Sequence, residues 1–301
     1  MDRRWKVKIL APQTKNLSKP QSAFLSALED RLKAEDLNVI SLEMMGRAGI
    51  GARYNEIRDC DGITILAFEQ WKGRRSTGDK DDDAVMPSEF THIGIVQAAL
   101  SQRPYLILRE KSLSSRGALR NGFADAPLDL PKLLDPDWLK SERAVTELTG
   151  FLRKVRARYH VFLGYSSQAK GVANMLSRFL TERLRLRVYD WERFAAGKSI
   201  WESIEDAEQR SNCGLFLFMK DDLIGYGEDQ KLGPRDNVIF EAGYFAGAKR
   251  RSRALVIREK DAKLPTDFGG ILYLELPSRE SIAAIETSLT DAVERLLTGA
   301  D

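Results

Sequence analysis

Short apolar runs rich in β-branched and aromatic residues alternate with longer amphipathic segments along the whole chain. The clearest runs lie at residues 7–10, 62–68, 105–110, 160–163, 214–219 and 254–258. Runs of this length with helical segments between them are typical of parallel strands in a sheet that helices cover on both faces. The pattern therefore predicts an α/β fold with three layers.

The order of these segments repeats at a nearly constant spacing. Residues 37–43 match residues 186–192, and residues 105–110 match residues 254–259, both at an offset of 149. Matches in one order at one spacing indicate a duplication, or two domains with one fold. Because the first half ends in an amphipathic segment near Arg156, we expect two tandem domains. Their bounds are residues 1–155 and residues 156–301.

Two predicted helices begin with a capping-box sequence, in which a serine is followed three residues later by Gln or Glu. Ser18 and Gln21 form the first pair, and Ser199 and Glu202 form the second. In the helix after Ser199, helical periodicity places Ile200, Ile204 and Ala207 on the buried face and Glu208 on the solvent face.

The composition excludes several classes of protein. The 47 Lys and Arg nearly balance the 44 Asp and Glu, so no strong field favours nucleic acid or an anionic membrane as a partner. No apolar run is long enough to span a bilayer, and we expect a cytoplasmic protein. Two cysteines and two histidines indicate neither a disulfide framework nor a metal cluster.

The sequence also lacks the motifs of several enzyme classes. Without a Walker A sequence, ATP hydrolysis of the P-loop type is not expected. Without Gly-x-Gly-x-x-Gly after a first strand, hydride transfer on a Rossmann domain is not expected either. A Gly-x-Ser-x-Gly nucleophile elbow is also absent.

The candidate binding residues follow the predicted strands of the second half, because ligands of open parallel sheets bind beyond the carboxyl ends of the strands. They are Tyr165, Ser166, Trp191, Asp222, Arg235 and Asn237. Aromatic faces suit a base, hydroxyls and cations suit phosphates, and carboxylates suit ribose hydroxyls. We therefore expect a nucleotide here. The alternative for Tyr165 and Trp191 is that they are ordinary rim aromatics.

Glu241 is the candidate catalytic residue. It is an acid in the otherwise apolar and small-residue stretch 238–247, and we place it in the first turn of a helix that packs on the sheet. A buried carboxylate is costly without a partner, and the partial positive charge of the helix N-terminus would keep it ionised. The alternative is a carboxylate that only caps its own helix.

Residues 159–276 resemble the TIR-like domain of bacterial antiphage effectors. The resemblance rests on residues 161–166, 220–222, 235–243 and 263–273. The stretches 235–243 and 264–267 are the most specific, and the whole covers over a third of the chain. Together with the internal repeat, it implies two tandem flavodoxin-like or TIR-like domains, each with three layers and a parallel sheet.

This family is similar to TIR domains that cleave NAD. By position in the motif, the resemblance implies that Glu241 is the catalytic glutamate. It places Tyr165, Ser166, Trp191 and Asn237 in the cleft that takes the dinucleotide. Residues 191–198 take the place of the TIR BB loop, which in the family moves and contacts a neighbouring protomer. A homo-oligomer built through TIR contacts is therefore expected.

The first half more loosely resembles nucleoside 2-deoxyribosyltransferase-like domains. At the offset of 149, His92 takes the position of Glu241, so the acid is missing. Cations that could hold phosphates at its ligand edge are Lys72, Arg74, Arg75, Arg116 and Arg120. The alternative for them is a mobile loop of mixed charge. We expect a regulatory domain that senses a nucleotide second messenger or a protein partner.

The function expected from these features is an NAD+ glycohydrolase that releases nicotinamide and leaves ADP-ribose or cyclic ADP-ribose. NAD is its substrate, and no further cofactor is expected. Two alternatives remain open. One is a nucleoside or nucleotide N-glycosidase or transferase that uses the same glutamate, and the other is a TIR module that assembles without turnover.

Overall fold

The computed structural model describes residues 4–43, 50–74, 83–194, 197, 199–224, 231–265, 268 and 270–298. The chain divides into two compact units, Asp2–Ala157 and Arg158–Asp301. Among the described residues, none of the helices combines the length and apolar character needed to cross a membrane.

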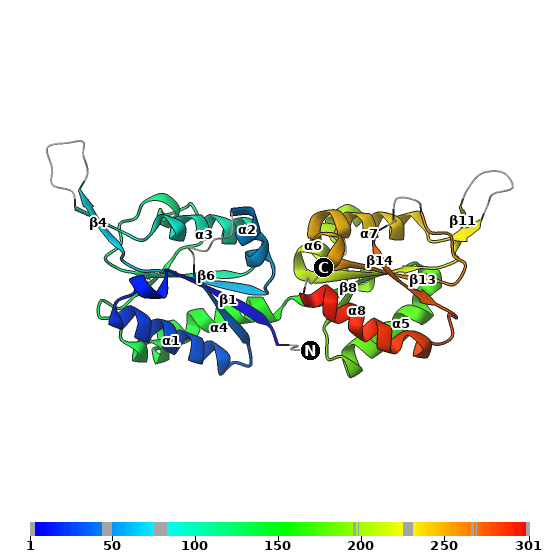
Figure 1. The fold of residues 1–301 in the computed structure, drawn as a ribbon, viewed down its shortest axis with the longest axis horizontal. Coiled ribbons are helices and arrows are strands. Elements are labelled where there is room, and N and C mark those ends of the chain that lie inside the picture. Colours follow the sequence, from blue (N-terminus) through cyan, green and yellow to red (C-terminus); the bar gives the residue numbers. More distant parts are fainter. Residues whose placement is uncertain are drawn as a thin grey trace. The chain divides into compact units, whose positions relative to one another are not determined.

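The N-terminal unit has a five-stranded parallel sheet. Its strands are β1 (Lys6–Ala11), β2 (Asn38–Glu43), β3 (Gly62–Ala67), β6 (Tyr105–Glu110) and β7 (Leu128–Leu130), in the order β2-β1-β3-β6-β7. Its helices are α1 (Lys19–Lys33), α2 (Ile50–Arg58), α3 (Glu89–Leu100) and α4 (Glu142–Arg156). The helices α2 and α3 cover one face, and α1 and α4 cover the other (Figure 1).

The C-terminal unit repeats this design. Its strands are β8 (Tyr159–Gly164), β9 (Val188–Asp190), β10 (Ser211–Phe218), β13 (Ala254–Glu259) and β14 (Leu272–Leu276), all parallel, in the order β14-β13-β10-β8-β9. Its helices are α5 (Lys170–Arg178), α6 (Ile200–Arg210), α7 (Asp236–Lys249) and α8 (Glu286–Thr298). The helices α6 and α7 cover one face, and α5 and α8 cover the other (Figure 1).

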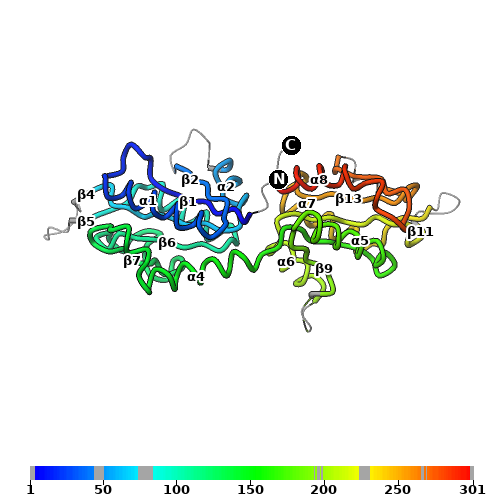
Figure 2. Tube along the Cα trace, turned by 90° about the horizontal axis from the view of Figure 1, so that it is seen from below, coloured from blue at the N-terminus to red at the C-terminus, as the bar shows by residue number. Residues whose placement is uncertain are grey.

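Both sheets therefore have their strands in the same spatial order, in which the first strand lies between the second and the third. Each unit also has a two-stranded antiparallel hairpin after its third strand (Figure 2). The hairpins are β4 (Trp71–Arg74) with β5 (Asp83–Met86), and β11 (Asp222–Ile224) with β12 (Lys231–Gly233). The predicted α/β fold with parallel sheets in three layers is confirmed.

The alternation of side chains along β8 separates two cores in the C-terminal unit. Val161 and Leu163 lie in the cluster with residues of α5 and α8. Phe162 lies in the cluster with residues of α6 and α7. Successive strand residues point to opposite faces of a sheet, so this alternation also decides which strand-end residues can share a site.

Both capping boxes are formed as predicted, at Ser18 with Gln21 and at Ser199 with Glu202. Two expectations for α6 are wrong. Ile200 is 70% exposed, although Ile204 and Ala207, which lie further along the helix, are buried.

The second error concerns Glu208, which is buried instead of facing water. Its carboxylate lies 2.9 Å from the Lys249 ammonium at the end of α7. A buried carboxylate needs a counter-charge, and here the neighbouring helix supplies it. Helical periodicity alone cannot reveal that partner.

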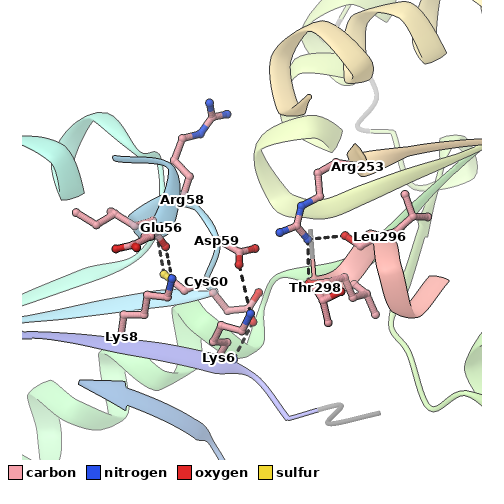
Figure 3. Close-up of polar contacts among 12 residues, drawn as sticks. Lys6, Lys8, Glu56, Arg58, Asp59, Cys60, Arg253, Leu296 and Thr298 are labelled. Atoms are coloured by element: carbon pink, nitrogen blue, oxygen red, sulfur yellow. Dashed lines mark hydrogen bonds and ion pairs between the residues drawn. The ribbon is translucent and has the colours of Figure 1, made fainter. Parts of the chain in front are cut away.

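Basic side chains bind the carbonyl groups at two helix ends (Figure 3). In the N-terminal unit, Lys8 donates to the carbonyl of Glu56 near the end of α2. In the C-terminal unit, Arg253 donates to the carbonyls of Leu296 and Leu297 near the end of α8, at 2.9 Å for the latter. Cations stabilise helix C-termini because the last carbonyls lack partners within the helix.

Candidate active site

Glu241 lies in the second turn of α7, one turn later than predicted, because the N-cap of the helix is Arg235. Its side chain is on the face of the sheet covered by α6 and α7, and the residue is only 4% exposed. A Cβ built on Gly164 would lie 2.7 Å from Glu241 Oε2 and 2.6 Å from a ring carbon of Phe216. The carboxyl group therefore lies close to Gly164, the last residue of β8.

The environment of Glu241 favours its neutral form. Oε2 has no hydrogen-bond partner among the described residues, and burial raises the pKa of the carboxyl from 4.5 to about 8. The expectation of an ionised carboxylate is wrong for this conformation. The reason is that removal from water outweighs the helix dipole, whose effect falls off within the first turn.

Tyr165 and Trp191 lie beside each other, with ring centroids 5.9 Å apart. Tyr165 is buried in the cluster packed against α5 and α8, on the face opposite Glu241. Burial, with the charges of Asp190 and Glu192, raises the pKa of its phenol to about 12. Trp191 is 37% exposed. Of the two predicted stacking residues, only Trp191 has a ring partly open to a ligand.

Ser166 is buried and already bonded. Its Oγ accepts a hydrogen bond from the Ala169 amide at 3.2 Å and donates to Asp221 Oδ2 at 2.5 Å. Asp221 in turn accepts from Arg279 at 3.1 Å, and Arg279 also donates to Glu259 at 2.8 Å. Ser166 thereby links the loop after β8 to the segment that follows β10.

Asp221, Glu259 and Arg279 were not predicted as site residues. Asp221 is the neighbour of the predicted Asp222 and follows a predicted strand, and this position could have identified it from the sequence. Arg279 follows β14 and has no local sequence signal, because its role depends on the strand order.

Glu259 has a counterpart at the same offset in the N-terminal unit. Glu259 accepts a hydrogen bond from the Lys220 amide at 2.8 Å, and Glu110 accepts one from the Glu69 amide. In both sheets, an acid at the end of the fourth strand thus binds the backbone just after the third. Burial opposes ionisation of Glu259, but hydrogen bonds from Arg279 and Lys220 lower its pKa overall. This repetition indicates a structural role.

Asp222 and Arg235 are brought together, with Arg235 Nε 3.4 Å from Asp222 Oδ2. Arg235 Nη1 also donates to Ser167 Oγ at 3.5 Å. Asn237 is exposed in the first turn of α7. The hairpin β11–β12 lies between Asp222 and Arg235 in the chain, and its residues 225–230 lie outside the described residues.

The loop after β9 contacts the hydrophobic cluster on the α6 and α7 face of the sheet, which includes residues of the helix that carries Glu241. Phe194 is half-buried and packs against that cluster, and its ring lies parallel to that of Phe162 with centroids 6.3 Å apart. Residues 195, 196 and 198 of the predicted BB loop lie outside the described residues, as do Thr266 and Asp267 of the resemblance. Phe194 is therefore the described residue that connects this loop to the core beneath Glu241.

The predicted equivalence of His92 and Glu241 is wrong. The helix N-caps Ser88 and Arg235 are separated by 147 residues. Buried positions agree at that spacing, because Thr91 matches Val238, Ile95 matches Ala242 and Ala98 matches Phe245. Gly94 is then the counterpart of Glu241. The acid is still missing from the N-terminal unit.

The five cations predicted to hold phosphates in the N-terminal unit do not form one described cluster. Arg120 lines a groove beside α3. Lys72 pairs with Glu69 at 3.4 Å. Arg75 and the side chain of Arg74 lie outside the described residues. Elsewhere in the described part of the chain, no group of three or more His, Cys, Asp or Glu could hold a metal ion.

The C-terminal unit contains a TIR-like domain. Residues 160–278 match the family described as "CAP12/Pycsar effector protein, TIR domain". This match confirms the resemblance drawn from the sequence for the second half. The likeness of the first half to nucleoside 2-deoxyribosyltransferase-like domains stays a prediction.

Several bacterial proteins are similar to this chain. CD-NTase-associated protein 12 of Lachnospiraceae bacterium (strain RUG226) is 30% identical over 139 residues, which are 45% of this chain and 44% of that protein. CD-NTase-associated protein 12 of Flavobacterium daejeonense is 32% identical over 136 residues, 45% of this chain and 43% of that protein. Pycsar effector protein PaPycTIR of Pseudomonas aeruginosa is 30% identical over 143 residues, 46% of each protein. The chain spans less than half the length of each relative.

Proposed function

We propose that the C-terminal unit is an NAD+ glycohydrolase and that Glu241 is its catalytic carboxylate, within an effector of antiphage defence. The observation that carries the proposal is the buried Glu241 carboxyl group, which has an oxygen without a partner among the described residues at the carboxyl end of a parallel sheet. Unpaired buried acids cost stability, and strongly shifted carboxyl groups concentrate at functional sites. The TIR-like match over residues 160–278 supports the same chemistry.

In the proposed reaction, the bond between ribose C1′ and the nicotinamide nitrogen breaks, and its electron pair neutralises the positive charge of the leaving pyridinium. The ribose becomes oxocarbenium-like, as in glycoside hydrolysis. The ionised Glu241 carboxylate stabilises that developing charge, and electrostatic stabilisation of this kind usually contributes most to the rate enhancement of an enzyme. Water then attacks C1′ and loses a proton, giving ADP-ribose. Attack by the adenine instead gives cyclic ADP-ribose.

The raised pKa of Glu241 fits a substrate that carries its own positive charge. In the free protein, burial keeps most of the carboxyl groups neutral at pH 7. A cation within about 4–6 Å favours the charged form of an acid. Binding of the nicotinamide ring therefore ionises Glu241 at the moment when its charge is needed.

A nucleotide signal is the proposed regulator of this reaction. The relative from Lachnospiraceae is named as a protein associated with a CD-NTase, and the relative from Pseudomonas is named as a Pycsar effector. These names support a cyclic nucleotide as the partner. We place the response to it in the N-terminal unit, which shares the fold and lacks the acid.

A second candidate function is assembly through the TIR-like unit without turnover. One observation favours self-association. The rings of Trp201, Phe240 and Tyr244 form a surface cluster on α6 and α7, with Trp201 and Phe240 5.0 Å apart. Trp201 and Phe240 are 53% and 40% exposed, and contiguous exposed apolar surface marks interaction sites.

The experiment that tests the proposal follows nicotinamide release by chromatography from NAD and the purified chain. We expect Glu241→Gln to lower the rate at least about 100-fold, the loss typical of one electrostatic contact to the transition state. Glu182→Gln is the matched control, because Glu182 is 61% exposed on its side chain and pairs only with a helical neighbour in the described structure. Equal rates for wild type and a folded Glu241→Gln would refute the proposal. Release of bases from nucleosides without nicotinamide release would select the N-glycosidase alternative.

A further inference from the structure

The Glu241 carboxyl group and Gly164 are complementary in shape. A Cβ on Gly164 would lie 2.7 Å from Glu241 Oε2, so the carboxyl occupies the space that a side chain on β8 would take. The N-terminal unit has the reverse arrangement. The strand register gives Leu10 the place of Gly164, Leu10 is buried, and Gly94 replaces Glu241 on the helix. The position of the end of β8 therefore decides where the carboxyl group lies.

A chain of hydrogen bonds holds the end of β8 in place. Ser166 follows Gly164 by two residues, and its Oγ donates to Asp221 Oδ2 at 2.5 Å. The other oxygen of this carboxylate, Oδ1, accepts from Arg279 Nη2 at 3.1 Å. Arg279 Nε in turn donates to Glu259 Oε2 at 2.8 Å. The chain thus connects the end of β8 to the segments that follow β10 and β14 and to the end of β13.

Asp221 is the buried member of this chain. Its side chain is 0% exposed, against 31% for Arg279, so it does not reach a ligand at the surface. A buried ion pair is often no more stabilising than apolar side chains of the same volume, and stability is therefore a weak reason for a charge here. The two oxygens of Asp221 accept from different partners in fixed directions, and such a pair specifies geometry.

The N-terminal unit provides an internal comparison. The bond from the backbone after the third strand to the acid of the fourth is common to both units, and it makes Gln70 the counterpart of Asp221. Gln70 is neutral and half-buried, and its side-chain amide donates to a carbonyl of the loop after β1 at 3.4 Å. The acid of the fourth strand, Glu110, accepts from Gln21 at 3.3 Å instead of from an arginine. Among the described residues, the buried acid and its arginine at this place thus occur only in the unit that has Glu241.

We propose that Asp221, held by Arg279, is a positioning residue of the active site, which through Ser166 fixes the end of β8 beside the Glu241 carboxyl group. The inference rests on the proposed NAD+ glycohydrolase function, and it adds a residue that acts on Glu241 without touching the substrate. Loss of the Asp221 side chain frees the end of β8 and admits water to the carboxyl. Burial is the cause of the raised pKa of Glu241, and no charged neighbour among the described residues contributes to it. This pKa therefore reports directly on the packing that Asp221 maintains.

The first measurement is kcat and KM for nicotinamide release by the full chain. Asp221→Ala is expected to lower kcat about ten- to a hundredfold, the cost of a misplaced catalytic group. It should change KM by less than about threefold, because the interaction is lost mainly in the transition state. Asp221→Asn is expected to keep most of the wild-type kcat, because its amide oxygen can accept from Arg279 while its NH2 group donates to Ser166. Gln70→Ala is the matched control at the same place in the N-terminal unit, and it is expected to leave both constants unchanged.

The second measurement is the pKa of Glu241 itself. In protein labelled with ¹³C at the glutamate carboxyl carbons, the NMR signal of this residue is the one that is absent from Glu241→Gln. We expect its pKa to fall from about 8 to about 7 or below in Asp221→Ala, because water then solvates the charged form, and to stay near the wild-type value in Asp221→Asn. The result does not depend on NAD cleavage. A chain that releases no nicotinamide would refute the proposed function and leave this test of positioning in force.

A second variant, Ser166→Ala, removes the link to β8 and leaves Asp221 paired with Arg279. It is expected to lower the pKa of Glu241 in the same way, and it keeps the test decisive where circular dichroism shows that Asp221→Ala does not fold. An unchanged pKa of Glu241 in either folded variant would overturn the proposal. So would an unchanged kcat in a folded Asp221→Ala of an active chain, or a loss of kcat in Asp221→Asn as large as the loss in Asp221→Ala. A folded variant that is less stable in urea but keeps the wild-type kcat and pKa would show a purely structural role.

Discussion

Replacing Glu241 by Gln is expected to stabilise the C-terminal unit, and by an amount that grows with pH. In the folded protein the pKa of this carboxyl is about 8, against an ordinary value of 4.5. Below about pH 4.5 the group is protonated whether the unit is folded or unfolded. As the pH rises to 8, the unfolded chain loses this proton first, so the free energy of unfolding falls. Above pH 8 both states are ionised and the loss is complete.

The size of the effect follows from the two pKa values. Each tenfold change in an ionisation equilibrium corresponds to about 1.4 kcal/mol. The folded unit therefore loses roughly 3 kcal/mol by pH 7, roughly 4 kcal/mol by pH 8 and roughly 5 kcal/mol well above pH 8, relative to acid. Glutamine has nearly the shape of protonated glutamic acid and does not titrate. The variant and the wild type are thus expected to be about equally stable near pH 4.5 and to diverge as the pH rises.

The assay measures the free energy of unfolding in urea from about pH 5 to about pH 8. Unfolding is monitored by hydrogen exchange of peptides from β10, so that only the C-terminal unit is measured. Taking the difference between variant and wild type cancels all other titrating groups. Glu182→Gln, an exposed change, is expected to shift stability by less than about 0.5 kcal/mol at every pH. A difference for Glu241→Gln that stays constant with pH, or a variant that is less stable at pH 8, would refute the reasoning.

Three further substitutions probe the packing and surface of the same unit. Gly164→Ala is expected to lower the free energy of unfolding in urea by about 1–3 kcal/mol, because the added Cβ would lie 2.6 Å from a core ring. Gly171→Ala is the control and should not destabilise the protein, because no atom lies within 4 Å of its Cβ. Equal effects of the two substitutions would contradict this packing. Glu208→Gln leaves the buried Lys249 ammonium without its counter-charge and is expected to cost about 3–5 kcal/mol, so a change below about 1 kcal/mol would show that the pair is not buried. Trp201→Ala is expected to weaken self-association in sedimentation velocity without changing thermal stability, and an unaltered oligomer would exclude this surface.

The sequence was sufficient for the fold because its signals are local or repeated. Apolar runs separated by amphipathic segments can be buried only as strands between two helical layers, and the repeat at a nearly constant spacing indicated the same order of elements in both halves. The capping boxes at Ser18 and Ser199 succeeded for the same reason, since every partner lies within one turn.

The site was less predictable, because its properties depend on contacts between distant elements. The pKa of Glu241 is set by the burial that β8 and α7 create together, and its place in the helix alone suggested the opposite direction. Tyr165 faces away from Glu241 because of the alternation along β8, which a motif does not display. The link from Asp221 to Arg279 joins residues that the strand order brings together.

The most direct test of the central claim is the pH dependence of kcat/KM for nicotinamide release from NAD, because this quantity reports the ionisation of the free protein. If the buried Glu241 carboxylate carries the reaction, kcat/KM rises nearly tenfold for each pH unit below 8 and levels off above the pKa of about 8. The residual activity of Glu241→Gln lacks that rise. A wild-type profile that is flat from about pH 6 to about pH 9, or one that falls as the pH rises, would contradict the account.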